Sequence, residues 1–198
     1  MKRFKAAALL FCLALCCALT ACSGTRRIYK SDLAVCLPEL VEQSKVLNEI
    51  YFGDGFPPRG EATLPGNGYY YVDGEVYGFE SIEQIKEATE QVFTPEYSVI
   101  LYAAAFDGVV GEDGAVSLPR YAEGELGLMQ YMGATVYDLA DRSYDFETLK
   151  IKKASRNRAT VSIETTDAQG GSATVELIVV RTLDEEGVEY YRLDSPTY

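Results

Sequence analysis

The sequence predicts an α+β protein in which helices pack on a curved antiparallel sheet, after a signal peptide that is cleaved during export. In the first half of the mature chain, apolar residues recur at helical spacing between capping and turn sequences. The second half alternates apolar and polar residues in short runs separated by turns, which is typical of an antiparallel meander. A basic and then apolar N-terminus indicates the signal peptide.

The first residues have the order of a secretory signal peptide. Met1-Lys2-Arg3-Phe4-Lys5 is basic, and an apolar run follows from Ala6 to Leu19. This run is shorter than the roughly 20 apolar residues that a membrane-spanning helix needs. We therefore expect residues 1–21 to be a signal peptide that is removed.

Leu19-Thr20-Ala21-Cys22 resembles the lipobox of bacterial lipoproteins, in which a large aliphatic residue and two small residues precede the cysteine that receives diacylglycerol. The resemblance implies that Cys22 is the lipid-attachment residue and the first residue of the mature chain. The protein would then lie on the extracytoplasmic face of the cell membrane, anchored by lipid. The alternative is an ordinary secretory signal with a chance cysteine.

The mature chain is strongly acidic. Removal of residues 1–21 takes away three of the 18 basic residues and none of the 30 acidic ones, so the formal charge changes from −12 to −15. Nonspecific nucleic-acid binding requires clustered Lys and Arg, so we expect no nucleic-acid partner. The remaining length fits one domain with its own core.

The cysteines and the missing histidines exclude several kinds of chemistry. Cys12, Cys16 and Cys17 leave with the signal peptide and Cys22 takes the lipid, so Cys36 cannot form an intramolecular disulfide. We expect Cys36 to be a buried apolar side chain. The chain has no histidine, which excludes Ser-His-Asp and Cys-His nucleophile systems and argues against zinc and non-haem iron. We therefore expect neither a metal nor a cofactor.

Residues 22–37 are expected to form a membrane-proximal tether, and residues 38–198 a single α+β domain. Basic residues in the tether would lie near lipid headgroups, although a solvated linker is the simpler interpretation. Pro38 suits the first position of a helix, where its missing N–H is not needed. We expect this helix to run to about Phe52.

Turn and capping sequences divide the rest of the domain. Asp73-Gly74 predicts a tight β-hairpin over residues 69–79. Ser81 begins a capping box and Thr94-Pro95 marks a second helix start, so two helices are expected here. The expected strands that follow span residues 116–122, 126–131, 134–139, 146–154, 159–166, 172–183 and 188–194. The strand at 172–183 is apolar on both faces in its middle, which predicts a central position in the sheet.

This order of elements resembles the nuclear transport factor 2-like (SnoaL-like, cystatin-like) cone fold over about residues 38–198. The resemblance implies a curved sheet that wraps a long helix and leaves a cavity at its wide end. Members of that family include dehydratases, isomerases and noncatalytic binding modules, so the fold alone does not select a function. The extra strands expected between residues 116 and 139 depart from the minimal pattern.

Three short stretches resemble a second group of proteins. The tail at residues 190–198, with Phe52-Gly53-Asp54-Gly55 and Pro119-Arg120-Tyr121, is similar to exported Firmicutes lipoproteins, some of which are related to inhibitors of cell-wall DL-endopeptidases. This resemblance implies an alternative function in which a protruding loop enters a peptidase cleft. Residues 53–67 and 108–114 are long enough to form such a loop.

The chain has fifteen tyrosines and no tryptophan. A cavity lined by tyrosine offers flat apolar faces with hydroxyls at the rim, which suits a sugar ring or another amphipathic ligand. Tyr121, Tyr131 and Tyr190 are the candidates for lining such a cavity. Most tyrosines are explained more simply as good strand formers on half-buried faces.

The resemblance to cone-fold isomerases implies an alternative enzymatic site. A tyrosine hydroxyl and carboxylates in an apolar cavity can move protons next to a carbonyl group. Asp107, Asp138 and Asp141, with Tyr121 or Tyr137, form the candidate set. Their spacing does not single them out, and each aspartate also fits an ordinary helix end or loop.

Lys150, Lys152, Lys153, Arg156 and Arg158 form a basic cluster in an acidic chain. Lys150 and Lys152 alternate with apolar residues, so they project from one face of a strand and could contact teichoic acid or anionic lipid. The simpler interpretation is that these lysines protect an exposed sheet edge from pairing.

The hypothesis that the sequence favours is a noncatalytic module that binds an envelope protein, a wall polymer or a small amphipathic ligand. The alternatives are an inhibitor of a cell-wall peptidase and a cone-fold isomerase or dehydratase that uses Tyr and Asp. An enzyme would show acids that converge inside a cavity, whereas a binding module would expose an aromatic cavity or an apolar patch.

Overall fold

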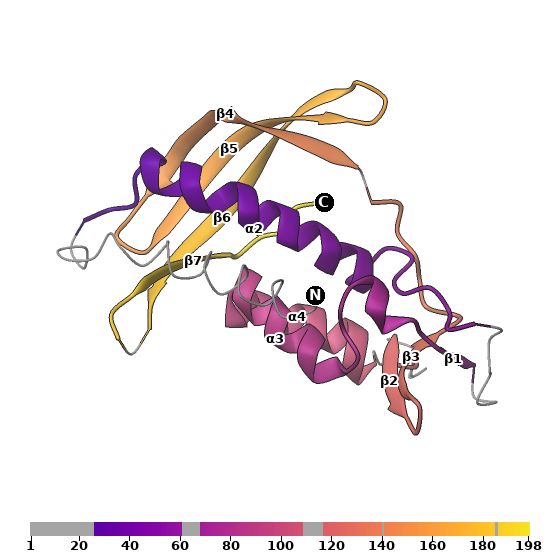
Figure 1. The fold of residues 1–198 in the computed structure, drawn as a ribbon. Helices are drawn as coiled ribbons and strands as arrows, with labels where there is room; N and C mark the ends of the chain where they lie inside the picture. The colour runs from indigo at the N-terminus through magenta and orange to yellow at the C-terminus, as the bar shows by residue number, and fades with distance from the viewer. Residues whose placement is uncertain (1–25, 61–67, 109–116, 140, 185) are drawn as a thin grey trace, which may run out of the picture.

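The computed structural model describes residues 26–60, 68–108, 117–139, 141–184 and 186–198. The predicted signal peptide and Cys22 lie outside these residues. The long helix α2 (Lys30–Tyr51) lies across a four-stranded antiparallel sheet, and a smaller three-stranded sheet lies beyond the C-terminal end of the helix (Figure 1). The predicted α+β class is confirmed.

The larger sheet is a meander. Its order is β4 (Arg142–Ala154), β5 (Arg158–Asp167), β6 (Ser172–Leu183) and β7 (Glu189–Leu193), each antiparallel to the next. β6 lies between two other strands, as its apolar sequence predicted, whereas β4 forms an edge. The core between helix and sheet contains Leu33, Leu37, Leu40, Val41 and Leu47 from α2, and Leu149, Val161, Ile163, Leu177 and Val179 from the strands.

The smaller sheet has the order β1 (Tyr69–Tyr71), β3 (Gly127–Tyr131), β2 (Tyr121–Gly124). The hairpin predicted over residues 69–79 is wrong. Asp73 Oδ1 accepts a hydrogen bond from the N–H of Glu75, which starts the 3-10 turn η2 (Gly74–Val76) instead of a hairpin turn. β1 pairs with the later strand β3, so a long-range partner overrides the local Asp-Gly signal.

Two further strand predictions need correction. No strand forms at residues 134–139, where the N–H of Tyr137 donates to the carbonyl of Phe52 at the end of α2 (2.8 Å). β2 starts at Tyr121, later than predicted, and β4 starts at Arg142, earlier than predicted. Both strands begin where a partner strand is available. A segment that favours the strand conformation forms no backbone hydrogen-bond ladder without a neighbouring strand.

The helices in the middle of the chain form where the sequence predicts them. Ser81 Oγ accepts from the N–H of Gln84 at the start of α3 (Ile82–Val92), and Thr94 Oγ1 accepts from the N–H of Tyr97 at the start of α4 (Pro95–Tyr102). A π-helical turn, η3 (Ala103–Asp107), continues α4. Gly108 ends this turn with a φ of +72°, a conformation that favours glycine.

The predicted helix start at Pro38 is wrong. α2 begins at Lys30, and Pro38 lies inside it. An interior proline costs about 3 kcal/mol, because it lacks an N–H and crowds the carbonyl four residues earlier. Leu33 and Leu37 are fully buried, and each burial contributes about 1.5–3 kcal/mol, which offsets that cost. Residues 30–37 therefore belong to the folded domain and not to a tether.

We predict that Leu37→Ala lowers the free energy of unfolding by about 2–5 kcal/mol, because it leaves a cavity against the sheet. Val35→Ala, on the exposed side of the same helix (76% exposed), should change that free energy by no more than about 0.5 kcal/mol. Chemical denaturation followed by circular dichroism measures both. Two equally small effects would contradict the packing of residues 30–37 in the core.

Candidate functional site

The C-terminal segment after β7 is held in place by buried hydrogen bonds. Thr197 Oγ1 lies 2.6 Å from Ser44 Oγ and accepts from Asn48 Nδ2 at 2.8 Å. The carbonyl of Thr197 accepts from the hydroxyl of Tyr144 at 2.5 Å. Ser195 Oγ accepts from the N–H of Ile178. The segment therefore forms a fixed wall between α2 and the start of β4.

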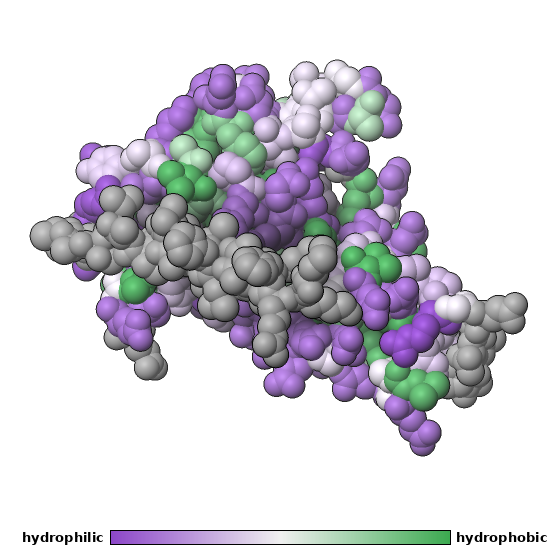
Figure 2. Space-filling view, in the orientation of Figure 1, coloured by the Kyte–Doolittle hydropathy of each residue, from purple (hydrophilic) through white to green (hydrophobic). Residues whose placement is uncertain are grey.

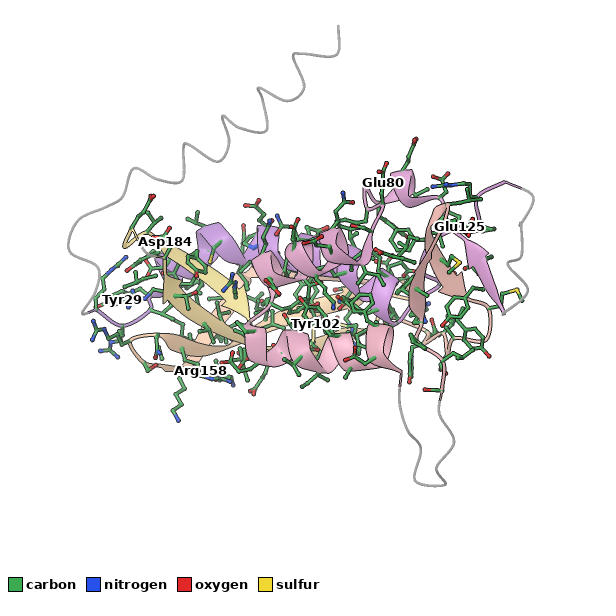
Figure 3. All side chains as sticks on the ribbon, turned by 90° about the horizontal axis from the view of Figure 1, so that it is seen from below. Tyr29, Glu80, Tyr102, Glu125, Arg158 and Asp184 are labelled. Carbon is green, nitrogen blue, oxygen red and sulfur yellow. The ribbon has the colours of Figure 1, made fainter. Side chains whose placement is uncertain are left out.

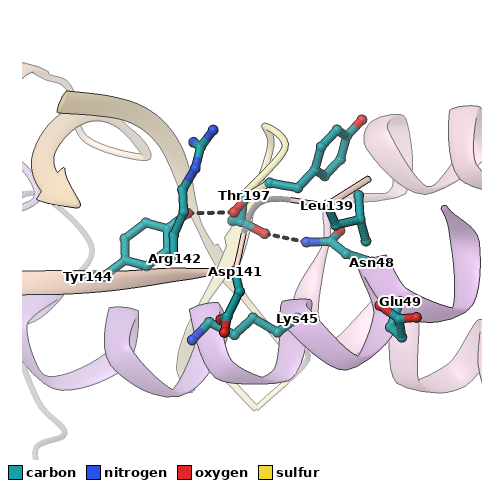
Figure 4. Close-up of a pocket in the computed structure, with 9 residues that line it drawn as sticks. Lys45, Asn48, Glu49, Leu139, Asp141, Arg142, Tyr144 and Thr197 are labelled. Atoms are coloured by element: carbon teal, nitrogen blue, oxygen red, sulfur yellow. Dashed lines mark hydrogen bonds between the residues drawn. The ribbon is translucent and has the colours of Figure 1, made fainter. Parts of the chain in front are cut away.

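A groove of about 200 Å³ lies along this wall (Figure 4). It is lined by Lys45, Asn48 and Glu49 from α2, Leu139, Asp141, Arg142 and Tyr144 from the chain entering β4, and Thr197 and Tyr198 from the C-terminal segment. The groove is open at the surface. It is smaller than the roughly 300–1,000 Å³ of typical small-molecule sites, so it can hold one ring or one end of a larger ligand.

Some charged side chains of the groove already form hydrogen bonds or ion pairs within the protein, and others do not. Glu49 Oε1 accepts from the N–H of Asp54 at 2.7 Å, so this carboxylate caps the chain after α2. Lys45 pairs at 2.8 Å with Glu42, whose side chain is exposed, and exposed pairs of this kind are weak. Asp141 and Arg142 form no ion pair with another described residue. One carboxylate and two cations can therefore meet a ligand.

An aromatic ledge, defined as Phe52, Tyr137 and Tyr198, adjoins the groove. The Phe52 ring lies 5.0 Å from that of Tyr198 and 6.1 Å from that of Tyr137, measured between centroids. Tyr137 and Tyr198 remain 58% and 42% exposed. Exposed rings held in place by one another offer flat apolar faces on which a planar or sugar ring can stack.

The three tyrosines predicted to line a cavity do not converge on one: Tyr121 and Tyr131 belong to the smaller sheet, and Tyr190 to the larger one. Tyr121 is fully buried, and its hydroxyl donates to the carbonyl of Ile50 at 2.6 Å. Tyr131 packs on Tyr69 in the smaller sheet, and Tyr190 lies under the guanidinium of Arg192 on β7. None of the three lines the groove.

The alternative enzymatic set is only partly brought together. Asp141 lines the groove and Tyr137 belongs to the adjoining ledge, whereas Asp107 ends the π-helical turn η3. Asp107, Asp138 and Asp141 are all exposed. Proton transfer by the proposed mechanism requires carboxylates enclosed in apolar surroundings, and these positions do not provide such surroundings.

A buried arginine joins two of the stretches that resemble exported lipoproteins. Arg120 is 5% exposed, and its guanidinium donates to the carbonyls of Gly53 and Thr135. Gln130 accepts from the N–H of Phe56 and donates to the carbonyl of Asp54. These bonds fix the chain that leaves α2, and with it the Phe52 ring of the aromatic ledge. The sequence pattern alone gave no signal for this role of Arg120.

Other observations limit the chemistry of the described residues. Burial raises the pKa of the Cys36 thiol to about 12, so at neutral pH this thiol is protonated and a poor nucleophile. The part of the chain that the structure describes contains no cluster of three or more metal-ligating side chains. In the same part, no helix is long and apolar enough to cross a membrane. The loops proposed for an inhibitor extend into residues 61–67 and 109–116, outside the described residues.

Comparison of the sequence with protein families and with curated proteins identifies no relative. A scan of protein-family models finds no match to the sequence, and a search of curated proteins also finds none. The groove, the aromatic ledge and the distribution of charge are the features of the structure that bear on function.

We predict that Thr197→Val lowers the free energy of unfolding by about 1–3 kcal/mol, because Ser44 and Asn48 then lose a buried hydrogen-bond partner. Thr174→Val, at an exposed position, is the matched control and should leave the free energy of unfolding nearly unchanged. Thermal unfolding of both variants measures the difference. If both variants unfold like the unmodified protein, the C-terminal segment does not form the fixed wall described above.

Proposed function

We propose that the protein is a noncatalytic binding module, held on the extracytoplasmic face of the cell membrane by lipid on Cys22. The observation that carries the binding function is the open groove of mixed charge beside an exposed aromatic ledge. The lipobox-like sequence Leu19-Thr20-Ala21-Cys22 supports the location. The likeness to the cone fold belongs to the same proposal, and a long helix lying across an antiparallel sheet supports it.

The chemistry of the groove suggests the class of ligand. Lys45 and Arg142 can bind an anionic group, Asp141 can bind an ammonium group, and the ledge can stack on a ring. A sugar that carries a short peptide combines these features, and cell-wall polymers outside the membrane have this chemistry. The small volume fits one repeating unit or one chain end of such a polymer.

Two features of the groove favour binding over catalysis. The hydroxyl of Tyr144 already donates to the carbonyl of Thr197, so it is committed to holding the C-terminal segment. Asp141 is exposed to water, whereas a carboxyl group that acts as a general acid is typically enclosed in apolar surroundings. The groove therefore offers charges and surfaces that recognise a ligand, without an enclosed acid–base pair.

We expect a soluble disaccharide-peptide fragment of the cell wall to bind saturably, and Tyr137→Ala/Arg142→Gln to raise its Kd more than 10-fold. Loss of one stacking surface costs about 0.5–1.5 kcal/mol, and loss of one charged hydrogen bond costs about 1.5–3 kcal/mol. Isothermal titration calorimetry measures both Kd values.

Tyr29→Ala, which removes an exposed tyrosine outside the groove, is the control for this titration and should keep the Kd of the unmodified protein. Saturable binding that Tyr137→Ala/Arg142→Gln leaves intact would place the ligand elsewhere on the molecule. No saturable binding of sugar-peptide fragments would contradict the proposed ligand class.

A further inference from the structure

Two basic stretches that are far apart in the sequence meet at one end of the molecule. The segment before α2 lies along the β4–β5 turn, where the N–H of Ile28 donates to the carbonyl of Ser155 at 3.1 Å. The buried side chain of Arg181 fixes the same contact, because its Nη2 donates to the carbonyls of Arg26 and Arg156. The segment that leads to the proposed anchor therefore leaves from the end that carries the β4–β5 turn.

We define the basic end as the cations gathered here, which are Arg26, Arg27, Lys30, Lys152, Lys153, Arg156 and Arg158. Tyr29 and Arg158 mark this end in Figure 3, and Glu80 and Glu125 mark the opposite end of the elongated molecule. The whole chain has a formal charge of −12, so this end concentrates cations within an acidic molecule.

Most of the charge at the basic end is not neutralised within the protein. Arg26 pairs with Asp32, and Arg158 pairs with Asp194. The other five cations, Arg27, Lys30, Lys152, Lys153 and Arg156, form no ion pair with another described residue. The nearby β6–β7 turn carries Asp184 and Glu186, but Figure 3 shows Asp184 and Arg158 on opposite sides of Tyr29.

We infer that the basic end docks on an anionic phospholipid surface and sets the orientation of the domain on the membrane. This orientation rests on the proposed lipid anchor. Arg26 is four residues after Cys22, and four residues span at most about 14 Å whatever their conformation. This upper limit is less than two Debye lengths of about 8–10 Å at physiological salt, so even at full extension the cations nearest to Cys22 meet a weakened field of the lipid headgroups, and any shorter span strengthens it.

The position of the proposed anchor favours phospholipid over a phosphate-bearing polymer as the partner of the basic end. A chain of teichoic acid phosphates has the same charge chemistry, but it has no fixed relation to the residue that carries the lipid. β4 runs from the basic end to the groove, and its 13 residues span roughly 40 Å. Docking through the basic end therefore holds the groove and the aromatic ledge well away from the membrane, where they can meet a ligand.

The test measures partition of residues 22–198 with Cys22→Ser, a chain that has no lipid but contains every described residue. Its folding is first checked by circular dichroism. The vesicles contain either phosphatidylcholine alone or phosphatidylcholine with phosphatidylglycerol. We expect binding to the anionic vesicles only, and weaker binding at higher salt.

Lys152→Gln/Lys153→Gln should weaken partition onto the anionic vesicles about 25-fold, since each cation near an anionic surface contributes about fivefold. Arg59→Gln/Lys86→Gln removes the same charge from outside the basic end and should partition like the unmodified chain. An equal loss of partition onto anionic vesicles in both double variants would overturn the proposal. The absence of any preference of the Cys22→Ser chain for anionic vesicles would also overturn it. Binding to soluble polyglycerol phosphate without binding to vesicles would also overturn it.

This experiment separates the docking surface from the proposed anchor. Because position 22 is serine in every chain tested, the result does not depend on lipidation. If the Cys22→Ser chain prefers anionic vesicles but the protein isolated from cells carries no lipid on Cys22, the docking surface is supported and the anchored function is contradicted. If the isolated protein carries lipid on Cys22 but the Cys22→Ser chain shows no such preference, the anchor is supported and the docking surface is overturned.

Discussion

The packing of α2 across the four-stranded sheet is the constraint on which the rest of the molecule depends. The 22-residue helix is about 33 Å long, nearly the length of β4, so one helix can cover the sheet from end to end. Its start is held by the bond from Ile28 to Ser155 and by the side chain of Arg181, whose buried charge is balanced by Glu189 at 3.3 Å. Its last turns are held through Thr197. On the face seen in Figure 2, the coloured part of the surface is mainly hydrophilic, with apolar side chains in separate patches.

The two ends of the molecule that α2 connects carry different side chains. The proposed function therefore assigns a different role to each end. One end gathers cations beside the segment that leads to Cys22. The other region presents a small groove of mixed charge and an aromatic ledge, which depends on Arg120 and on the C-terminal segment for its shape. In the proposed function, the domain docks on an anionic membrane surface through the basic end and binds a ligand at the groove.

Local signals in the sequence predicted much of the fold, and long-range contacts account for the failures. The caps at Ser81 and Thr94 and the turns of the meander are local, so α3, α4 and the order of β4 to β7 were predictable. Pro38 misled because burial of Leu33 and Leu37 against strands that are distant in the sequence outweighs the local cost of the proline. The groove was missed because its lining comes from residues near 45, 141 and 197, which no spacing rule connects. Of the predicted site residues, Asp141 lies in it and Tyr137 beside it.

The most direct test of the central claim is the mass of the N-terminal peptide of the protein isolated from membranes of a bacterium that expresses the full chain. We predict a mature protein that begins at Cys22 and carries diacylglycerol on its sulfur, and a Cys22→Ser chain that is no longer processed to this form. A mature N-terminus elsewhere without lipid, or a chain that keeps residues 1–21, would contradict a domain held at the membrane by Cys22.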